Sequence, residues 1–259
     1  MGKSSQCFLV IQFKLYICLN LIHVMTKSIF LETHNLKNKA TGLGTFNYEL
    51  IKGFSQLEFD DLELPLNVKN PGLLESEFGE KFKYHKYTNL SRHWIFRTRK
   101  KHDLWHSVNQ NTKVEPFHVN KYLLTVHDVN FVEEISSDMH HKVNQLFIEK
   151  LKKSTAITYI SEFAKKQTHQ YFDVPNVPEY VIHNGNPIST ILDTSKFISP
   201  IPLDKPFRYS IGDFLERKNF LSLVKMMVHI TDFNLILSGN NNKAYGKEIE
   251  QFIKENNLQ

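Results

Sequence analysis

The sequence predicts an α/β fold built from two units, each with a parallel sheet covered by helices. From Met25 onward, short apolar runs of strand length alternate with amphipathic runs of helical spacing. That alternation is typical of strand–helix–strand units with parallel strands. Residues 186–206 are rich in proline and show no clear periodicity, which indicates a linker. We therefore expect a Rossmann-like unit over 25–190, a linker over 191–206 and the start of a second Rossmann-like unit over 207–259.

The elements of the first unit follow from its apolar pattern. The expected strands are 29–32, 122–126, 156–160 and 180–183. The expected helices begin at Thr41, at Asp138 and at Ser161, which caps the third. One face of the first helix is apolar and consists of Phe46, Leu50, Ile51 and Phe54.

The second unit shows the same alternation. Its expected strands are 207–211 and 233–237, and its closing helix surrounds Ile249. A helix from Asn219, its expected cap, to about Ile230 separates the strands. The apolar stripe of that helix consists of Phe220, Leu223, Val224, Met227 and Val228.

Composition limits the functional classes. With 259 residues, 41% of them hydrophobic and 23% charged, the chain has the profile of a soluble globular protein. A net charge of +5 and a pI near 9.0 favour an anionic partner, which could be a nucleotide, a lipid headgroup or nucleic acid. Cys7 and Cys18 form neither a disulfide framework nor a zinc pattern, so a reducing compartment fits.

Residues 1–24 have two interpretations. Residues 7–24 are mostly apolar, but Gln12, Lys14 and Asn20 interrupt them, and no cleavage site of a secretory signal follows. They could form a membrane-lying segment. We favour an upstream extension, because Met25 begins a short polar lead into the first core strand.

The turn after the strand 207–211 carries a glycine and two adjacent cations. The connection between this strand and the following helix contains Gly212, Arg217 and Lys218. The start of a helix next to two cations is a favourable place to bind a diphosphate. The alternative is a solvated cationic turn.

Three further groups follow strand ends in the first unit, where ligands bind in such folds. Gly42 and Gly44 permit a tight turn near a phosphate, although most such pairs only make turns. His127 could face a ligand hydroxyl as a neutral imidazole while Asp128 orients its loop, or the pair could simply end a strand. The turn at Asn184 and Gly185 leaves the first unit and could also line a cleft.

The ordered set of these segments resembles the group 1 (family 4) retaining glycosyltransferases of GT-B fold. The matching motifs are Thr41-Gly-Leu-Gly44, Leu123-Leu-Thr-Val-His-Asp128, Ile157-Thr-Tyr-Ile-Ser-Glu-Phe-Ala164, Val181-Ile-His-Asn-Gly185 and Ile211-Gly-Asp-Phe-Leu-Glu-Arg-Lys-Asn219. The resemblance runs from about Ser28 to the end and is weakest over 57–101. It also implies a short strand at 103–106.

The resemblance implies roles for individual residues. Gly42 and Gly44 would lie near the donor phosphates, and His127, with Asp128 beside it, would face the donor sugar. Arg217 and Lys218 would hold the diphosphate leaving group. Gly212, in the turn before them, would let the backbone approach that group. Such cations lower the barrier of glycosyl transfer without a metal, so we expect no cofactor and a nucleotide sugar as substrate.

One part of the family pattern is absent. The family continues with two glutamates eight positions apart, which hold the sugar and ribose of the donor. Glu248, Glu250 and Glu255 do not have that spacing. We therefore expect an incomplete second unit and a fragment or truncated gene product, whose activity stays open.

Residues 81–102 carry eight Lys or Arg and no Asp or Glu, interleaved with aromatic side chains. This composition favours a patch for an anionic membrane or acceptor, and the alternative is a solvated basic helix and loop. Its central cations are Arg92, Arg97, Arg99, Lys100 and Lys101. No recognised nucleic-acid motif accompanies them, so we expect no nucleic-acid partner.

The expected function is transfer of a hexose, with retention, to a cell-envelope polysaccharide, lipopolysaccharide or lipid-linked acceptor of bacterial type. The expected location is the cytoplasm, including the inner face of the cell membrane. Two alternatives stay open: a non-catalytic, truncated transferase acting as a binding module, and a GT-B nucleotide-sugar epimerase, which would need acid/base carboxylates.

Overall fold

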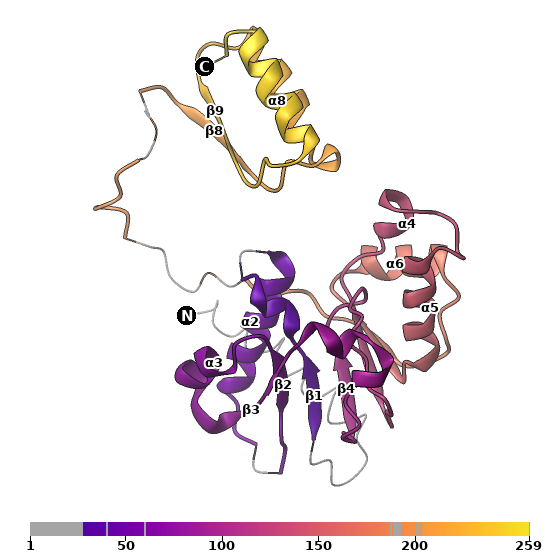
Figure 1. Ribbon diagram of the computed structural model, residues 1–259. Helices are drawn as coiled ribbons and strands as arrows, with labels where there is room; N and C mark the ends of the chain where they lie inside the picture. Colours follow the sequence, from indigo (N-terminus) through magenta and orange to yellow (C-terminus); the bar gives the residue numbers. More distant parts are fainter. Residues whose placement is uncertain are drawn as a thin grey trace. The chain divides into compact units, whose positions relative to one another are not determined.

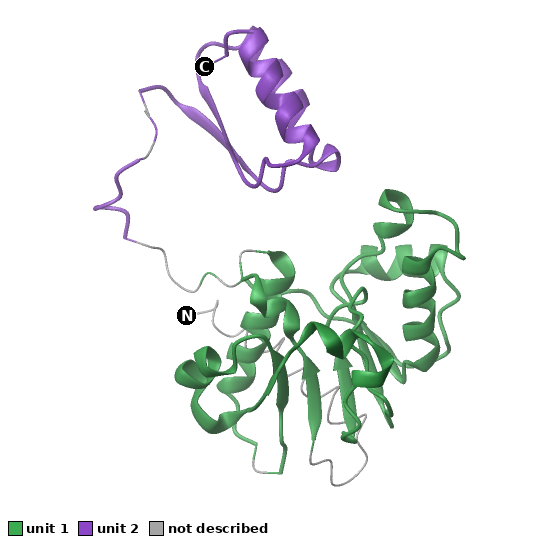
Figure 2. Cartoon of the chain, in the orientation of Figure 1, with its two compact units in different colours: residues 1–190 green, residues 191–259 purple. Residues whose placement is uncertain are grey.

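The computed structural model describes residues 28–39, 41–59, 61–186, 188, 193–199, 201 and 204–258. The segment 1–24 and part of the expected linker lie outside these residues. The chain divides into two compact units between Thr190 and Ile191, shown in green and purple in Figure 2.

The first unit is built on a seven-stranded sheet in which all paired strands are parallel. Its strands are β1 (Ile29–Glu32), β2 (Pro65–Val68), β3 (Lys83–Lys86), β4 (Leu104–Ser107), β5 (Tyr122–Val126), β6 (Ala156–Tyr159) and β7 (Glu179–Val181). Their order is β3-β2-β1-β4-β5-β6-β7. The order reverses between β1 and β4, and such a reversal is where open α/β sheets bind ligands, beyond the carboxyl ends of the strands.

Helices cover both faces of this sheet (Figure 1). They are α2 (Gly42–Ser55), α3 (Pro71–Phe78), α4 (Phe131–Glu134), α5 (Lys142–Lys153) and α6 (Glu162–Tyr171). Because side chains alternate along a strand, Leu31 packs in one core with Phe54 of α2, whereas Phe30 packs in the other with Phe147 of α5. Short 3-10 helices fill the connections: η1 (His34–Lys37), η2 (Gly79–Lys81), η3 (Asn89–Arg92) and η4 (Trp94–Phe96).

The second unit contains the parallel pair β8 (Phe207–Ile211) and β9 (Asn234–Ser238). Its helical elements are η5 (Glu216–Lys218), α7 (Phe220–Met226), η6 (Met227–His229) and α8 (Ala244–Glu255). Phe220 and Val224 of α7 pack with Ile249 of α8 in a small core of its own.

The predicted α/β class with parallel sheets is confirmed. β1, β5 and β8 have the predicted bounds. Ser161 caps α6 as expected, since its hydroxyl accepts a hydrogen bond from the Ala164 N–H at 3.1 Å.

The start of one expected helix was wrong, and the alternative of a basic helix over 81–102 does not hold. The helix expected from Asp138 begins at Lys142, because the Asn144 amide donates to the carbonyl oxygens of Ser136 and Asp138 and holds the preceding residues in a turn. The segment 81–102 is not a basic helix, since it contains the edge strand β3 followed by η3 and η4.

Candidate functional site

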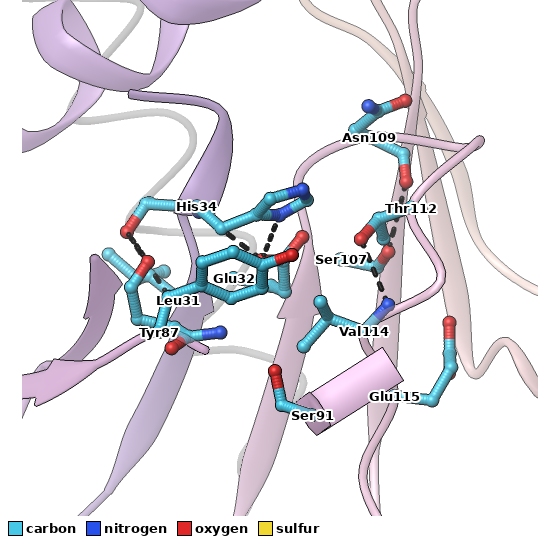
Figure 3. Close-up of polar contacts among 12 residues, drawn as sticks. Leu31, Glu32, His34, Tyr87, Ser91, Ser107, Asn109, Thr112, Val114 and Glu115 are labelled. Carbon is cyan, nitrogen blue, oxygen red and sulfur yellow. Dashed lines mark hydrogen bonds and ion pairs between the residues drawn. The ribbon is translucent and has the colours of Figure 1, made fainter. Parts of the chain in front are cut away.

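The reversal of strand order places an acidic residue at the carboxyl edge of the first sheet. Glu32 of β1 lies directly opposite Ser107 of β4. Its Oε1 accepts two hydrogen bonds from His34, from Nδ1 at 2.6 Å and from the backbone N–H at 3.2 Å (Figure 3). Glu32 is fully buried, and its Oε2 has no hydrogen-bond partner among the described residues. A buried carboxylate oxygen without a hydrogen-bond partner is uncommon in folded proteins.

Sequence reasoning missed this pair. The strand 29–32 reads as apolar core up to its last residue, and the only available signal was a carboxylate followed two positions later by a histidine at a strand end. The importance of Glu32 comes from the reversal of strand order between β1 and β4. The order of strands in a sheet cannot be read from a single sequence.

Below this edge lies a buried ionic network. Lys150 of α5 donates to Ser107 Oγ at 3.2 Å and to the Tyr122 hydroxyl at 3.1 Å. Glu115 forms ion pairs with Lys150 and Lys153. Burial raises the pKa of the Glu115 carboxyl, but the charges and hydrogen bonds of the two lysines outweigh burial and hold that pKa below its ordinary value. The network therefore fixes the β4–β5 connection against α5.

His127 follows β5 and is half-buried. Its Nε2 lies 2.9 Å from the carbonyl oxygen of Val108, so this nitrogen carries the proton and donates it. The ring also meets the Phe46 ring edge to face, with centroids 4.6 Å apart. Strand β5, the loop after β4 and helix α2 therefore meet at this imidazole and fix its orientation.

Asp128 is exposed, and its carboxylate accepts a hydrogen bond from the Asn130 N–H at 3.2 Å. The neighbouring Gln110, which sequence reasoning did not select, is buried and bonds both residues of the His-Asp pair. Its Nε2 donates to the Asp128 carbonyl oxygen at 2.8 Å, and its Oε1 accepts from the His127 N–H at 3.2 Å. Gln110 thus clamps the loop that carries His127.

The two glycines at the start of α2 have different surroundings. Thr41 caps the helix by accepting the Gly44 N–H at 3.2 Å. A Cβ on Gly44 would lie 1.8 Å from the carbonyl oxygen of Asn38, so this glycine is required by packing. A Cβ on Gly42 would meet nothing within 4 Å among the described residues. Only the exposed Gly42, whose N–H has no partner within the helix, is open to a ligand.

Asn184 and Gly185 lie in the segment after β7 and are exposed. The preceding residue, His183, lies with its Nδ1 3.2 Å from the carbonyl oxygen of Ile160, the residue after β6. A ligand role for this turn stays a prediction.

The glycine turn of the second unit holds a lysine against its backbone. Gly212 has φ +155°, in the region that favours glycine. The Lys218 side chain lies across it, with Cε 3.6 Å from the position that a Cβ would take. On the other side, a Cβ on Gly239 would lie 1.8 Å from the Gly212 carbonyl oxygen, so Gly239 permits the close approach of the two strand ends. Arg217 and Lys218 are exposed in η5.

The expected N-cap of the following helix is in place, but it makes no side-chain capping bond. Asn219 occupies the N-cap position of α7 in a left-handed conformation, with φ +52°, and its side chain accepts from the Ser222 hydroxyl at 2.7 Å instead of a backbone N–H. Because α7 has only 7 residues, the positive charge at this turn comes chiefly from Arg217 and Lys218.

The basic segment is less cationic than its composition indicates. Lys100 pairs with Glu63 at 3.7 Å, and the Arg97 Nε is buried. Arg92, Arg99 and Lys101 are exposed, and so are large apolar side chains of the same segment. Those side chains are Leu90, Trp94, Ile95 and Phe96. Cations and exposed apolar groups therefore share this surface.

The described residues lack two kinds of feature. They contain no cluster of three or more His, Cys, Asp or Glu side chains able to hold a metal ion. Within the same residues, no helix has the length and apolar character needed to cross a membrane.

The strand order, parallel sheets and strand-end polar groups define an α/β protein of the Rossmann-like, GT-B class. One of the solved structures that resemble it is sucrose-phosphate synthase from Thermosynechococcus elongatus, a GT-B glycosyltransferase, with a TM-score of 0.58 and 15% sequence identity. The similarity covers 90% of this chain and 68% of that one. At this identity the likeness shows the fold alone. No family model matches the chain, and no curated protein matches it in sequence.

Proposed function

We propose that this protein is a glycosyltransferase that takes a hexose from a nucleotide sugar and transfers it, with retention, to a cell-envelope glycan or lipid-linked acceptor. The single observation that carries the proposal is Lys218, whose side chain lies across the backbone of Gly212 at the carboxyl end of β8. A cation held over a glycine turn at a strand end suits the diphosphate of a donor. The fold shared with a glycosyltransferase supports the same assignment.

The chemistry explains why a lysine is needed there. When the bond between the sugar and the phosphate breaks, negative charge develops on the departing nucleoside diphosphate. A preorganised ammonium aimed at that charge stabilises the transition state more than the ground state, and therefore raises turnover. Arg217, next in the same short helix, is the second proposed cation.

The sugar-facing role proposed for His127 rests on the first unit alone. Val108, Phe46 and Gln110 hold the imidazole and its loop in one orientation. Because the ring is already oriented, it loses little conformational entropy when it binds a sugar hydroxyl. The exposed Gly42 at the start of α2 belongs to the helix that contacts His127, and we propose that it approaches a donor phosphate.

We also propose that the surface of Arg92, Arg99, Lys101, Trp94 and Ile95 touches an anionic membrane. Cations near such a surface contribute about 1 kcal/mol each, and exposed apolar side chains can enter the interface. Co-sedimentation with phosphatidylglycerol vesicles over a salt series tests this. We expect binding at low salt that is lost when the three cations are replaced by serine, and unchanged binding in that variant would contradict it.

The transfer proposal is tested by offering the protein a panel of uridine, guanosine and adenosine diphosphate sugars. Release of the nucleoside diphosphate and the anomeric configuration of the product, read by NMR, give donor and stereochemistry together. We expect one donor to be consumed with retention. Donor binding without any turnover would instead favour the non-catalytic binding module, and a changed sugar on an intact nucleotide would favour the epimerase.

A further inference from the structure

A hollow of about 250 Å³ opens at the carboxyl end of the first sheet, on the side of β1, β2 and β3. Three consecutive connections supply its walls. Lys37 ends η1 after β1, Lys69 follows β2 directly, and Tyr87 follows β3 directly, with Asn89 two residues further on. The hollow therefore lies where parallel sheets bind ligands, and its four lining residues differ from every residue assigned to the donor above.

The hollow is positively charged. Within the described part of the chain, neither Lys37 nor Lys69 has an ion-pair partner, and both side chains are exposed. The Lys37 ammonium and the Arg92 guanidinium each lie 5.9 Å from the centre of the Tyr87 ring. Two cations therefore flank one aromatic ring, and Lys69 lines the same hollow. An anion bound there would relieve the repulsion among these cations.

The tyrosine and the asparagine are held in place. Tyr87 is buried, and its ring stacks on His34 with centroids 4.7 Å apart. Its hydroxyl donates to Asn89 Oδ1 at 3.1 Å. Because the amide oxygen already accepts this bond, the Asn89 NH₂ group is the part of the amide that can donate to a ligand. One oriented donor and two lysine ammoniums match the several oxygens of a phosphate group better than the two of a carboxylate.

We propose that this hollow binds a phosphate group, and that the phosphate belongs to the acceptor. The second half of the proposal rests on the proposed transferase function, whereas phosphate binding does not. A hollow of this volume is at the small end of ligand sites, so a monosaccharide phosphate or a phosphorylated lipid headgroup fits it. Lys37 and Lys69 contact the phosphate oxygens, and Asn89 donates the fixed hydrogen bond.

Calorimetric titration of the full chain with glucose 6-phosphate tests phosphate binding, with glucose as the uncharged probe. The test variant is Lys37→Gln with Lys69→Gln. The matched control is Lys83→Gln with Lys166→Gln, which removes the same charge from two exposed lysines outside the hollow. We expect affinity for glucose 6-phosphate to fall about 10-fold or more in the test variant and to change little in the control. An equal loss of affinity for glucose 6-phosphate in the test and control variants would overturn the proposal. Binding of glucose as tight as that of glucose 6-phosphate would overturn it as well.

Asn89→Ala gives an independent check, because this residue is exposed and carries no charge. We expect weaker phosphate binding with an unchanged salt dependence, and an unchanged affinity would contradict the proposed donor. Vesicles of phosphatidic acid, compared with phosphatidylcholine, form the second arm. If only vesicle binding responds to the Lys37 and Lys69 changes, the phosphate is that of a lipid headgroup. If phosphate binds at the hollow but no donor is ever consumed, the transferase proposal fails, whereas the proposal of a phosphate site is upheld.

Discussion

The Nε2 of His127 lies 2.9 Å from the carbonyl oxygen of Val108, and this bond ties the end of β5 to the loop after β4. Phe46 of α2 packs edge to face against the imidazole ring of His127. The histidine is therefore better anchored than a freely exposed strand-end residue. Its orientation is set by three elements that are distant in sequence.

We expect His127→Ala to impair transfer while the protein stays folded. Losing one hydrogen bond and one ring contact at a half-buried site should lower the free energy of unfolding by only about 1 kcal/mol. Transfer rate and thermal unfolding are measured together, with the exposed His140→Ala as the control. If residual activity merely followed the folded fraction, the role of His127 would be structural.

The two glycines of α2 should respond in opposite ways to alanine. Gly44→Ala places a methyl group 1.8 Å from the Asn38 carbonyl oxygen, so the loop must move, and we expect a loss of roughly 1–3 kcal/mol in unfolding free energy. Gly42→Ala meets open space and should be neutral or slightly stabilising. Urea unfolding gives the free energy of unfolding of both variants. Equal destabilisation of the two would contradict the claim that packing requires a glycine at position 44. In the proposed function only Gly42→Ala affects donor binding.

Much of the sheet was predictable because its central strands are continuously apolar. β1 and β5 lie inside the sheet with helices on both faces, so their sequences read as short apolar runs flanked by polar residues. β2 and β3 were not predicted. β2 begins at Pro65, and β3 is a largely exposed edge strand in which a tyrosine and a histidine stand between two lysines, so neither resembles a core strand.

The site was predictable in part for a different reason. His127 and the Gly212 turn stand in local motifs that follow strands, and a sequence displays such motifs directly. Gln110 and the hollow of Lys37, Lys69 and Tyr87 arise from residues brought together by strand order. No local pattern marks them, since each is an ordinary polar or aromatic residue in its own segment.

Stability should fall in mild acid because of His102. Burial, with Lys100 and His85 nearby, lowers the pKa of His102 from 6.5 to about 4. A group whose pKa is lower in the folded state contributes stability that is complete above pH 6.5 and is lost as the pH falls toward 4. The loss should not exceed about 3 kcal/mol.

The measurement is thermal unfolding between pH 7 and 4 for the parent protein and for His102→Gln, which can keep the hydrogen bond to Ser28 Oγ. We expect the variant to show a flatter dependence on pH in this window. Identical curves would assign the acid sensitivity to other groups.

The central claim is that Lys218 stabilises the diphosphate leaving group. The most direct test is the turnover number of Lys218→Ala with its nucleotide-sugar donor, beside Lys247→Ala, which removes an exposed lysine of α8 in the same unit. We expect turnover to fall by the equivalent of roughly 2–4 kcal/mol in Lys218→Ala, with far less change in acceptor binding, and to stay unchanged in the control. Unchanged turnover in Lys218→Ala would contradict the account.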